Sequence, residues 1–177
     1  MNLGEAQVYA EKVVAILQPF CSCIMTAGSI RRGKAEVGDV DIVALPKAVD
    51  LPGGLCGVVK VDPSTVWKNL IPKALVKSGL KLEVSGKELQ RFSFPSGLQV
   101  DVYRARPETW GVILLIRTGS KEHNVKLCTL ARSKGLMLSA SQGVIENHNI
   151  VACRTEEGIF SALGLKFVEP KDREVHF

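Results

Sequence analysis

The stretch Gly28-Ser29-Ile30-Arg31-Arg32-Gly33, followed by Gly38-Asp39-Val40-Asp41-Ile42-Val43, decides the interpretation of this chain. Its second half predicts a strand over residues 39–45. Asp39 and Asp41 are two residues apart, so both carboxylates project from one face of this strand, and apolar residues face the other side. Two neighbouring acids repel each other and are a poor structural choice without a cation. Mg²⁺ fits such a place because it binds carboxylate oxygens together with phosphate and water.

A third acid, Asp101, stands between apolar neighbours in another predicted strand, over residues 98–104. If this strand lies beside the first, three carboxylates converge. Such a cluster predicts a two-metal site for in-line phosphoryl transfer. We therefore take Asp39, Asp41 and Asp101 as candidate catalytic residues and as ligands of two Mg²⁺ ions, for which Mn²⁺ can substitute.

The Gly28-Ser29 step indicates a phosphate-binding turn. At the start of a short helix, expected over residues 30–33, backbone N–H groups and the serine hydroxyl can approach a phosphate closely. Arg31 and Arg32 follow, and the forked guanidinium group is suited to phosphate oxygens. Each of these features is common in unrelated proteins, but their combination in this order, ahead of a third acid, is specific.

The remainder of the chain predicts an α+β fold, with a mixed sheet flanked by helices and a smaller α/β unit after it. The sheet and its helices are expected in residues 1–105 and the smaller unit in residues 106–177. Amphipathic periodicity and turn residues place helices over residues 3–17, 63–77, 107–117, 120–133 and 155–163, and further strands over 23–26, 81–84, 88–94, 136–138, 144–146 and 150–151.

Composition excludes several classes of protein. The 177 residues are 46% hydrophobic and 23% charged, as in a globular chain of one domain or two small ones. No apolar run approaches the roughly 18 residues of a membrane span, and the N-terminus lacks the pattern of a signal peptide. An odd number of cysteines without an export signal favours reduced thiols in a soluble intracellular protein. These cysteines are Cys21, Cys23, Cys56, Cys128 and Cys153.

Most of the net charge of +5 comes from one segment, Lys60 to Arg91, which holds seven basic and three acidic residues. A basic segment is compatible with an anionic partner such as nucleic acid. A solvated helix face and a surface that follows a phosphate backbone remain equally good interpretations of it.

The order Gly-Ser-x-Arg-Arg-Gly … Gly-Asp-x-Asp resembles the palm signature of the family X DNA polymerases, which include DNA polymerase beta. The likeness spans about Ala27 to Arg173 and is weakest between Pro46 and Leu98. Further matching motifs are Thr118-Gly119-Ser120 with Asn124, Ala131-Arg132-Ser133-Lys134-Gly135 in the thumb, and Glu169-Pro170-Lys171-Asp172-Arg173.

The resemblance implies a role for each candidate residue. Asp39 and Asp41 would bind both metal ions, and Asp101 would bind the catalytic ion near the primer 3′-hydroxyl and accept its proton. The nucleotide would contact Gly28, Ser29, Arg32, Gly38, Gly119, Ser120 and Asn124. We also expect Lys73, Lys77, Lys81, Lys126 and Arg132 to contact DNA.

Three departures from the family's pattern also stand out. Only 27 residues precede Gly28, too few for the family's lyase domain and fingers, so we expect a palm (residues 1–105) and a thumb (residues 106–177) only, as in compact viral members. Ile116-Arg117 stands where the family usually has Tyr-Phe under the sugar. Gln99 stands where an arginine is frequent two residues before the third acid.

The expected function is template-directed DNA polymerase activity of the DNA repair type. The protein would act as a monomer on gapped or primed DNA, adding deoxynucleoside triphosphates (dNTPs) to a primer 3′-end in short gaps. Two alternatives follow from the same residues. One is a nucleotidyltransferase acting on RNA, a small molecule or a protein, and the other is a DNA-binding protein without turnover.

Overall fold

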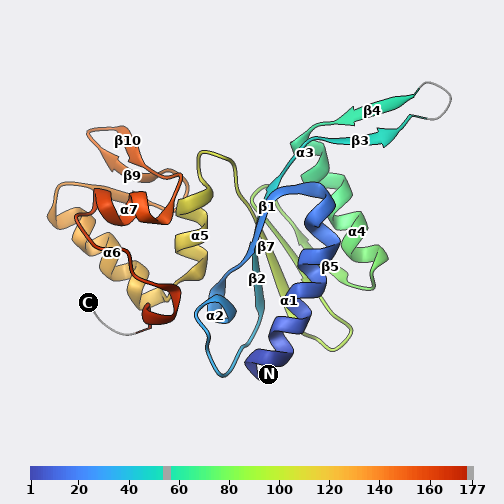
Figure 1. Cartoon of the computed structure of the whole chain (residues 1–177), viewed down its shortest axis with the longest axis horizontal. Helices are drawn as coiled ribbons and strands as arrows, with labels where there is room; N and C mark the ends of the chain where they lie inside the picture. Colours follow the sequence, from blue (N-terminus) through green and yellow to red (C-terminus); the bar gives the residue numbers. More distant parts are fainter. Residues whose placement is uncertain (54–56, 175–177) are drawn as a thin grey trace.

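The computed structural model describes residues 1–53 and 57–174, and its larger part is a five-stranded sheet with helices against it (Figure 1). The elements up to residue 104 are α1 (Leu3–Leu17), β1 (Cys21–Thr26), α2 (Gly28–Arg31), β2 (Val40–Pro46), β3 (Val49–Pro52), β4 (Val58–Val61), α3 (Pro63–Thr65), the π-helical turn η3 (Val66–Leu70), α4 (Ile71–Lys77), β5 (Lys81–Ser85), β6 (Leu89–Ser93) and β7 (Gln99–Arg104). Those after it are α5 (Trp110–Thr118), α6 (Lys121–Ser133), β8 (Met137–Ser139), β9 (Gly143–Glu146), β10 (Asn149–Ala152) and α7 (Glu156–Ala162). Among the described residues no helix is long and apolar enough to cross a membrane.

The large sheet has the strand order β1-β2-β7-β6-β5 and is mixed, because β2 and β7 are parallel whereas every other neighbouring pair is antiparallel. Val40, Ile42 and Val100 are fully buried on one face of it, in a core with residues of α1 and α4. Strand alternation therefore directs Asp41 and Asp101 to the opposite face. This arrangement confirms the expected α+β fold with a mixed sheet.

A second hydrophobic cluster lies in the C-terminal part of the chain. It joins α5, α6 and α7 with β8 and β9, through buried residues such as Leu115, Leu127 and Phe160. Helix α5 lies between this cluster and the sheet, as Figure 1 shows, and Leu114 packs with Ala27 and Val43 on the sheet side. The two cores are therefore connected through α5, next to the carboxylate face.

The structure differs from the sequence predictions within several of the predicted elements. Strand β2 begins at Val40, so Asp39 immediately precedes the strand, and α5 begins at Trp110, after a turn, instead of at residue 107. The helix expected over 63–77 contains the turn η3, where the Ile71 amide donates to the Val66 carbonyl and Pro72 has no amide to continue the α pattern.

The antiparallel pair β3–β4 was not predicted. Its strands have four residues each, and β4 is largely exposed. Three consecutive residues of β4, from Val58 to Lys60, are exposed, so β4 lacks the alternation that marks a strand in a sequence. Cys21, Cys23, Cys128 and Cys153 form no disulfide, in agreement with the predicted thiols, and Cys56 lies outside the described residues.

Candidate active site

The turn at Gly28 packs directly against the side chain of Asp41. Gly28 begins α2 with a φ of +57°, and a Cβ atom there would lie 2.9 Å from Cγ of Asp41 and still closer to its Oδ2. The amide of Ala27 donates to the Asp41 carbonyl at 2.8 Å. Only glycine combines this φ with so close an approach, so the turn and the carboxylate form one structural unit.

Asp41 and Asp101 are partners in the register of the parallel strands β2 and β7. The condition for convergence of the acids, that the two strands lie side by side, is therefore met. Burial, together with repulsion from Asp39 and Asp101, raises the pKa of Asp41 to about 7. A cation bound at this place would stabilise the charged form of the Asp41 carboxyl group and would lower its pKa again.

Protein donors engage the carboxylate of Asp101. Arg91 on β6 donates from Nε to Oδ1 and from Nη2 to Oδ2, both at 2.8 Å, and the Tyr103 hydroxyl donates to Oδ2 at 3.2 Å. Within residues 1–53 and 57–174, no group of three acidic, histidine or cysteine side chains is arranged to hold a metal ion. The oxygens of Asp39 and Asp41 fit Mg²⁺, whereas Asp101 is paired with an arginine.

Ser29 follows Gly28 in the turn, and its Oγ atom is buried without a hydrogen-bond partner among the described residues. A buried hydroxyl without a protein partner usually forms its hydrogen bond with a ligand or with water. α2 is a single turn of four residues, so it offers an anion its first amides rather than the dipole of a long helix. This geometry suits a phosphate at the turn.

Arg32 is held between two partners from the C-terminal part of the chain. Its Nε pairs with the Glu174 carboxylate, and its Nη1 donates to the Thr118 carbonyl. Lys34 also pairs with Glu174, at 3.2 Å. Burial alone would raise the pKa of Glu174, but hydrogen bonds from Arg32 and Lys34 lower it below its ordinary value. A phosphate would therefore compete with Glu174 for Arg32.

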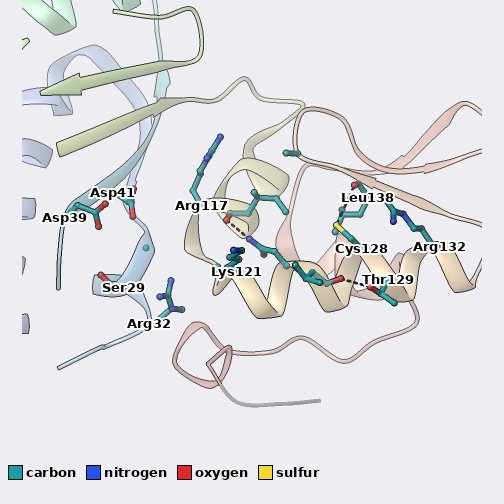
Figure 2. Close-up of a pocket in the computed structure, with 16 residues that line it drawn as sticks. Ser29, Arg32, Asp39, Asp41, Arg117, Lys121, Cys128, Thr129, Arg132 and Leu138 are labelled. Atoms are coloured by element: carbon teal, nitrogen blue, oxygen red, sulfur yellow. Dashed lines mark hydrogen bonds between the residues drawn. The ribbon is translucent and has the colours of Figure 1, made fainter. Parts of the chain in front are cut away.

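A cleft of about 740 Å³ between the sheet and α6 is lined by Gly28, Ser29, Arg32, Asp39 and Asp41, but not by Asp101. Figure 2 shows Ser29, Arg32, Asp39 and Asp41 on one side of it and side chains of α6 on the other. Cations from both sides reach the cleft, namely Arg32, Arg117, Lys121 and Arg132. Arg117 also stacks on the Tyr103 ring, with its guanidinium carbon 4.1 Å from the ring centre. An acidic pair facing several cations matches the needs of a metal-bound polyphosphate.

Two of the remaining predicted nucleotide contacts line this cleft, and the other two, Ser120 and Gly38, do not. Gly119 and Asn124 line it, and Asn124 donates to the Ile116 carbonyl at 2.9 Å. Ser120 is buried at the start of α6, where its hydroxyl caps the amide of His123 and donates to the Arg173 carbonyl. A Cβ atom on Gly38 would meet nothing within 4 Å, so no contact within the protein requires glycine there.

The predicted DNA contacts fall into two groups. Lys73 and Lys77 are exposed on α4, the helix that packs on the sheet face opposite the carboxylates, so the fold does not bring them to the acids. Lys81 pairs in register with Ser93, which pairs with Gln99, and it therefore shares the face of Asp101. On α6, Arg132 lines the cleft, and Lys126 lies on the same helix.

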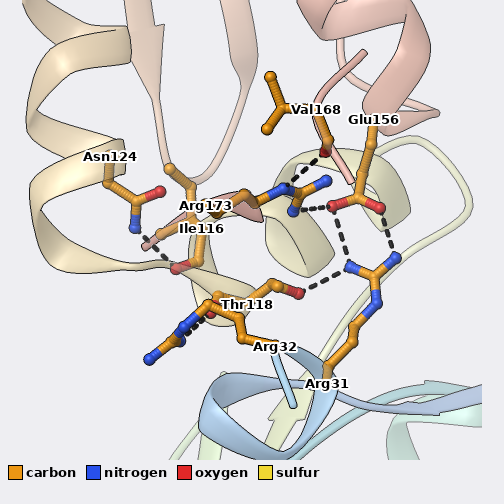
Figure 3. Close-up of polar contacts among 8 residues, drawn as sticks. All are labelled: Arg31, Arg32, Ile116, Thr118, Asn124, Glu156, Val168 and Arg173. Atoms are coloured by element: carbon orange, nitrogen blue, oxygen red, sulfur yellow. Dashed lines mark hydrogen bonds and ion pairs between the residues drawn. The ribbon is translucent and has the colours of Figure 1, made fainter. Parts of the chain in front are cut away.

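A buried ion network ties α2 to the C-terminal part of the chain (Figure 3). Both carboxylate oxygens of Glu156 accept from Arg31, at 3.0 and 2.6 Å, and Oε1 also accepts from Arg173 at 2.7 Å. Arg31 donates further to the Thr118 hydroxyl at 2.7 Å. Because Glu156 is 5% exposed and Arg173 is fully buried, these charges fix α2 relative to α5 and α7.

Sequence reasoning missed three of the residues that bear on the site: Arg91, Glu156 and Glu174. Each is a single charged residue outside any motif recognised in the sequence. The partners in these contacts are 10 to 142 residues apart in the sequence, from Arg91 and Asp101 to Glu174 and Arg32. Arg91 could have been found only by pairing the two predicted strands in the correct register, which places it opposite Asp101.

Comparison with known proteins finds similarity to DNA polymerases. A family model for the DNA polymerase beta thumb matches residues 113–174. Over 97% of its length the chain is 27% identical to the DNA polymerase/3'-5' exonuclease PolX of Bacillus subtilis (strain 168), and over 88% it is 26% identical to DNA polymerase lambda of Rattus norvegicus. These alignments cover 28% and 29% of the two relatives, so the chain spans less than a third of their length.

A solved structure shares the fold. The crystal structure of Leishmania infantum polymerase beta, described as a ternary P/T complex, matches with a TM-score of 0.75 at 20% sequence identity. The match covers 98% of this chain and 76% of the other. The two chains therefore share one fold.

Proposed function

We propose that this chain, which is a relative of the family X DNA polymerases, is a template-directed DNA polymerase that adds dNTPs to a primer 3′-end in short gaps. One observation carries the proposal. Asp41 and Asp101 are register partners on the sheet face opposite α1 and α4, with Asp39 beside them and the Gly28 turn packed against Asp41. Asp39, Asp41 and the Gly28 turn line the same cleft, and this supports a metal site next to a phosphate-binding turn.

Asp39 and Asp41 would hold two Mg²⁺ or Mn²⁺ ions, with Asp101 as a further ligand of the ion next to the primer. When bound, these ions supply the charge neutralisation that phosphoryl transfer needs. Asp101 lies on the strand neighbouring Asp41, and in the proposed mechanism it accepts the proton of the primer 3′-hydroxyl. The raised pKa of Asp41 supports the assignment, because a nearby cation would offset the burial and the repulsion that raise it.

The triphosphate would lie between the turn and the C-terminal part of the chain. The free hydroxyl of Ser29 and the guanidinium of Arg32 would bind its oxygens, and Arg32 would exchange Glu174 for phosphate. Asn124, which lines the far side of the cleft, would lie beside the base and sugar. Catalysis by these side chains consists of orientation and charge stabilisation.

We further propose a division near residue 105 into a palm, residues 1–105, and a thumb, residues 106–177. Two separate hydrophobic clusters on either side of this point support the division. In the proposed complex a single copy of the chain holds gapped or primed DNA between the two parts. Lys81 on the palm and Arg132 on the thumb would contact its phosphates, the former from the acid face and the latter from the cleft.

Single-nucleotide incorporation into a one-nucleotide DNA gap, with Mg²⁺, tests the proposal. The unsubstituted chain is expected to insert the base that the template specifies. Asp101→Ala is expected to lower the rate on the order of a hundredfold or more. Asp50→Ala, which removes an exposed acid on β3, is the matched control and should leave the rate unchanged. Insertion without regard to the template, or no extension despite intact nucleotide binding, would contradict the proposal and favour a non-DNA acceptor.

A further inference from the structure

Arg91 and Asp101 form a forked pair across two neighbouring antiparallel strands. The two residues are register partners in β6 and β7, and two hydrogen bonds of 2.8 Å join the guanidinium to both carboxylate oxygens. The Tyr103 hydroxyl takes a further position on Oδ2, and the Gln99 amide lies 3.5 Å from Oδ1. Both oxygens of the third acid are therefore occupied by donors from the protein.

The two partners differ in burial. The side chain of Asp101 is 4% exposed, whereas that of Arg91 is 38% exposed. A carboxylate buried to this extent needs a countercharge, and Asp41 beside it adds a second negative group. The more exposed Arg91 can leave the pair for solvent, while Asp101 is fixed within its strand.

No neutral neighbour can replace this countercharge. Gln99 lies on the same face of β7 as Asp101, but an amide donates a hydrogen bond without neutralising a charge. Tyr103 likewise offers Oδ2 of Asp101 only a hydrogen bond from its hydroxyl, at 3.2 Å. The cation for Asp101 therefore comes from the adjacent strand β6.

We propose that Arg91 is a positioning residue that holds Asp101 as an ion pair before metal and primer arrive, a role that rests on the proposed polymerase function. Arg91 fixes the orientation of both carboxylate oxygens and occupies the place of a divalent cation. A metal ion reaches Asp101 only when Arg91 shares or releases it. Metal binding at the third acid is consequently coupled to movement of the Arg91 side chain.

The coupling is measured by titrating the full chain with Mn²⁺, without DNA or nucleotide, by electron paramagnetic resonance. Arg91→Met is expected to raise the apparent Mn²⁺ affinity by about tenfold, because it removes a cation that competes with the metal ion for both oxygens of Asp101. In an Asp101→Asn background, Arg91→Met is expected to change the Mn²⁺ affinity less than about twofold, because the effect of Arg91 depends on the Asp101 carboxylate. Arg91→Lys, which keeps the charge without the fork, should lie between.

Controls separate this coupling from a general change in charge or stability. Arg106→Met removes an arginine from an exposed ion pair with Glu88 and should leave Mn²⁺ affinity unchanged. If Arg91→Met lacks a cooperative unfolding transition, Arg91→Gln, which keeps a donor for Asp101, gives the same comparison. Equal gains with and without the Asp101 carboxylate, or no gain at all, would overturn the proposal.

The outcome is independent of primer extension. A gain in Mn²⁺ affinity that depends on Asp101, together with no primer extension, would support the proposed role of Arg91 and contradict the polymerase assignment. Primer extension without a dependence of Mn²⁺ affinity on Asp101 would support the polymerase assignment and contradict the proposed role of Arg91.

Discussion

Gly28 and Asp41 lie so close that a Cβ atom on Gly28 would come within 2.9 Å of Cγ of Asp41. The contact joins the turn before α2 to the carboxylate on β2. Because β2 is a fully hydrogen-bonded inner strand of the sheet, Asp41 would have to turn its side chain to make room. The absence of a side chain at residue 28 therefore determines where this carboxylate lies.

Gly28→Ala is expected to abolish nucleotide incorporation, with the loss measured in the single-nucleotide gap assay. The added methyl group displaces the Asp41 carboxylate from its place beside Asp39. The positive φ adds a conformational cost of about 1 kcal/mol to folding. Gly97→Ala is the matched control, because Gly97 also has a positive φ but would carry a Cβ in open space. Comparable activities of the two variants would show that the contact with Asp41 has no part in function.

Glu174→Gln is expected to lower the KM for dNTP without lowering kcat. The Glu174 carboxylate pairs with Arg32 and Lys34, and a triphosphate must displace it to reach Arg32. Steady-state kinetics on gapped DNA measure the effect. Glu169→Gln, at an exposed position in the same segment, is the control. A raised KM would instead show that Glu174 orients Arg32 for the substrate.

Charge reversal distinguishes the two faces of the sheet in DNA binding. Lys81→Glu should weaken binding of gapped DNA and reduce the salt dependence of the affinity by about one ion, because Lys81 shares the face of Asp101. Lys77→Glu changes the same charge on α4, behind the sheet, and should have a smaller effect. Fluorescence anisotropy across a range of salt concentrations measures both. An equal loss in the two variants would place DNA on both sides and support the sequence-based expectation for Lys73 and Lys77.

The pKa of Asp41 predicts how stability depends on pH. Its folded value of about 7 exceeds the ordinary value of 3.8, so between these values the folded state binds more protons than the unfolded state. The favourable contribution of the neutral carboxyl is complete below about pH 4 and is lost as the pH rises through 7. In the metal-free protein, the gain in stability from Asp41→Asn should therefore grow over this range, to roughly 2–4 kcal/mol.

Urea unfolding of the metal-free chain and of Asp41→Asn, at several pH values, measures this difference. His123 acts with the opposite sign, since burial lowers its pKa to about 4 and stability rises between pH 4 and 6.5. The comparison cancels this contribution because both chains contain His123. A pH-independent difference between the two chains would contradict the shift at Asp41. Added Mg²⁺ should stabilise the unsubstituted chain more at pH 8 than at pH 5.

The amino-acid sequence determined the elements of the sheet and the chemistry of its acids. Alternation of Val40, Ile42 and Ala44 with Asp39 and Asp41 predicted which side chains are buried, because successive residues of a strand face opposite sides. The helices of the C-terminal part were also predictable, as for α6, which was expected over residues 120–133 and is found at Lys121–Ser133. Periodicity and capping are properties of a few neighbouring residues, so the sequence expresses them directly.

The tertiary structure alone decided the partners of the charged groups. Arg91 faces Asp101 because β6 and β7 pair in one register, and Glu174 reaches Arg32 because the C-terminal part folds back on α2. It also placed Lys77 behind the sheet and Lys81 on the face of Asp101. Ion pairs between residues far apart in the chain depend on strand register and on the packing of separate elements. No local pattern encodes them, and only the folded chain brings these charges together.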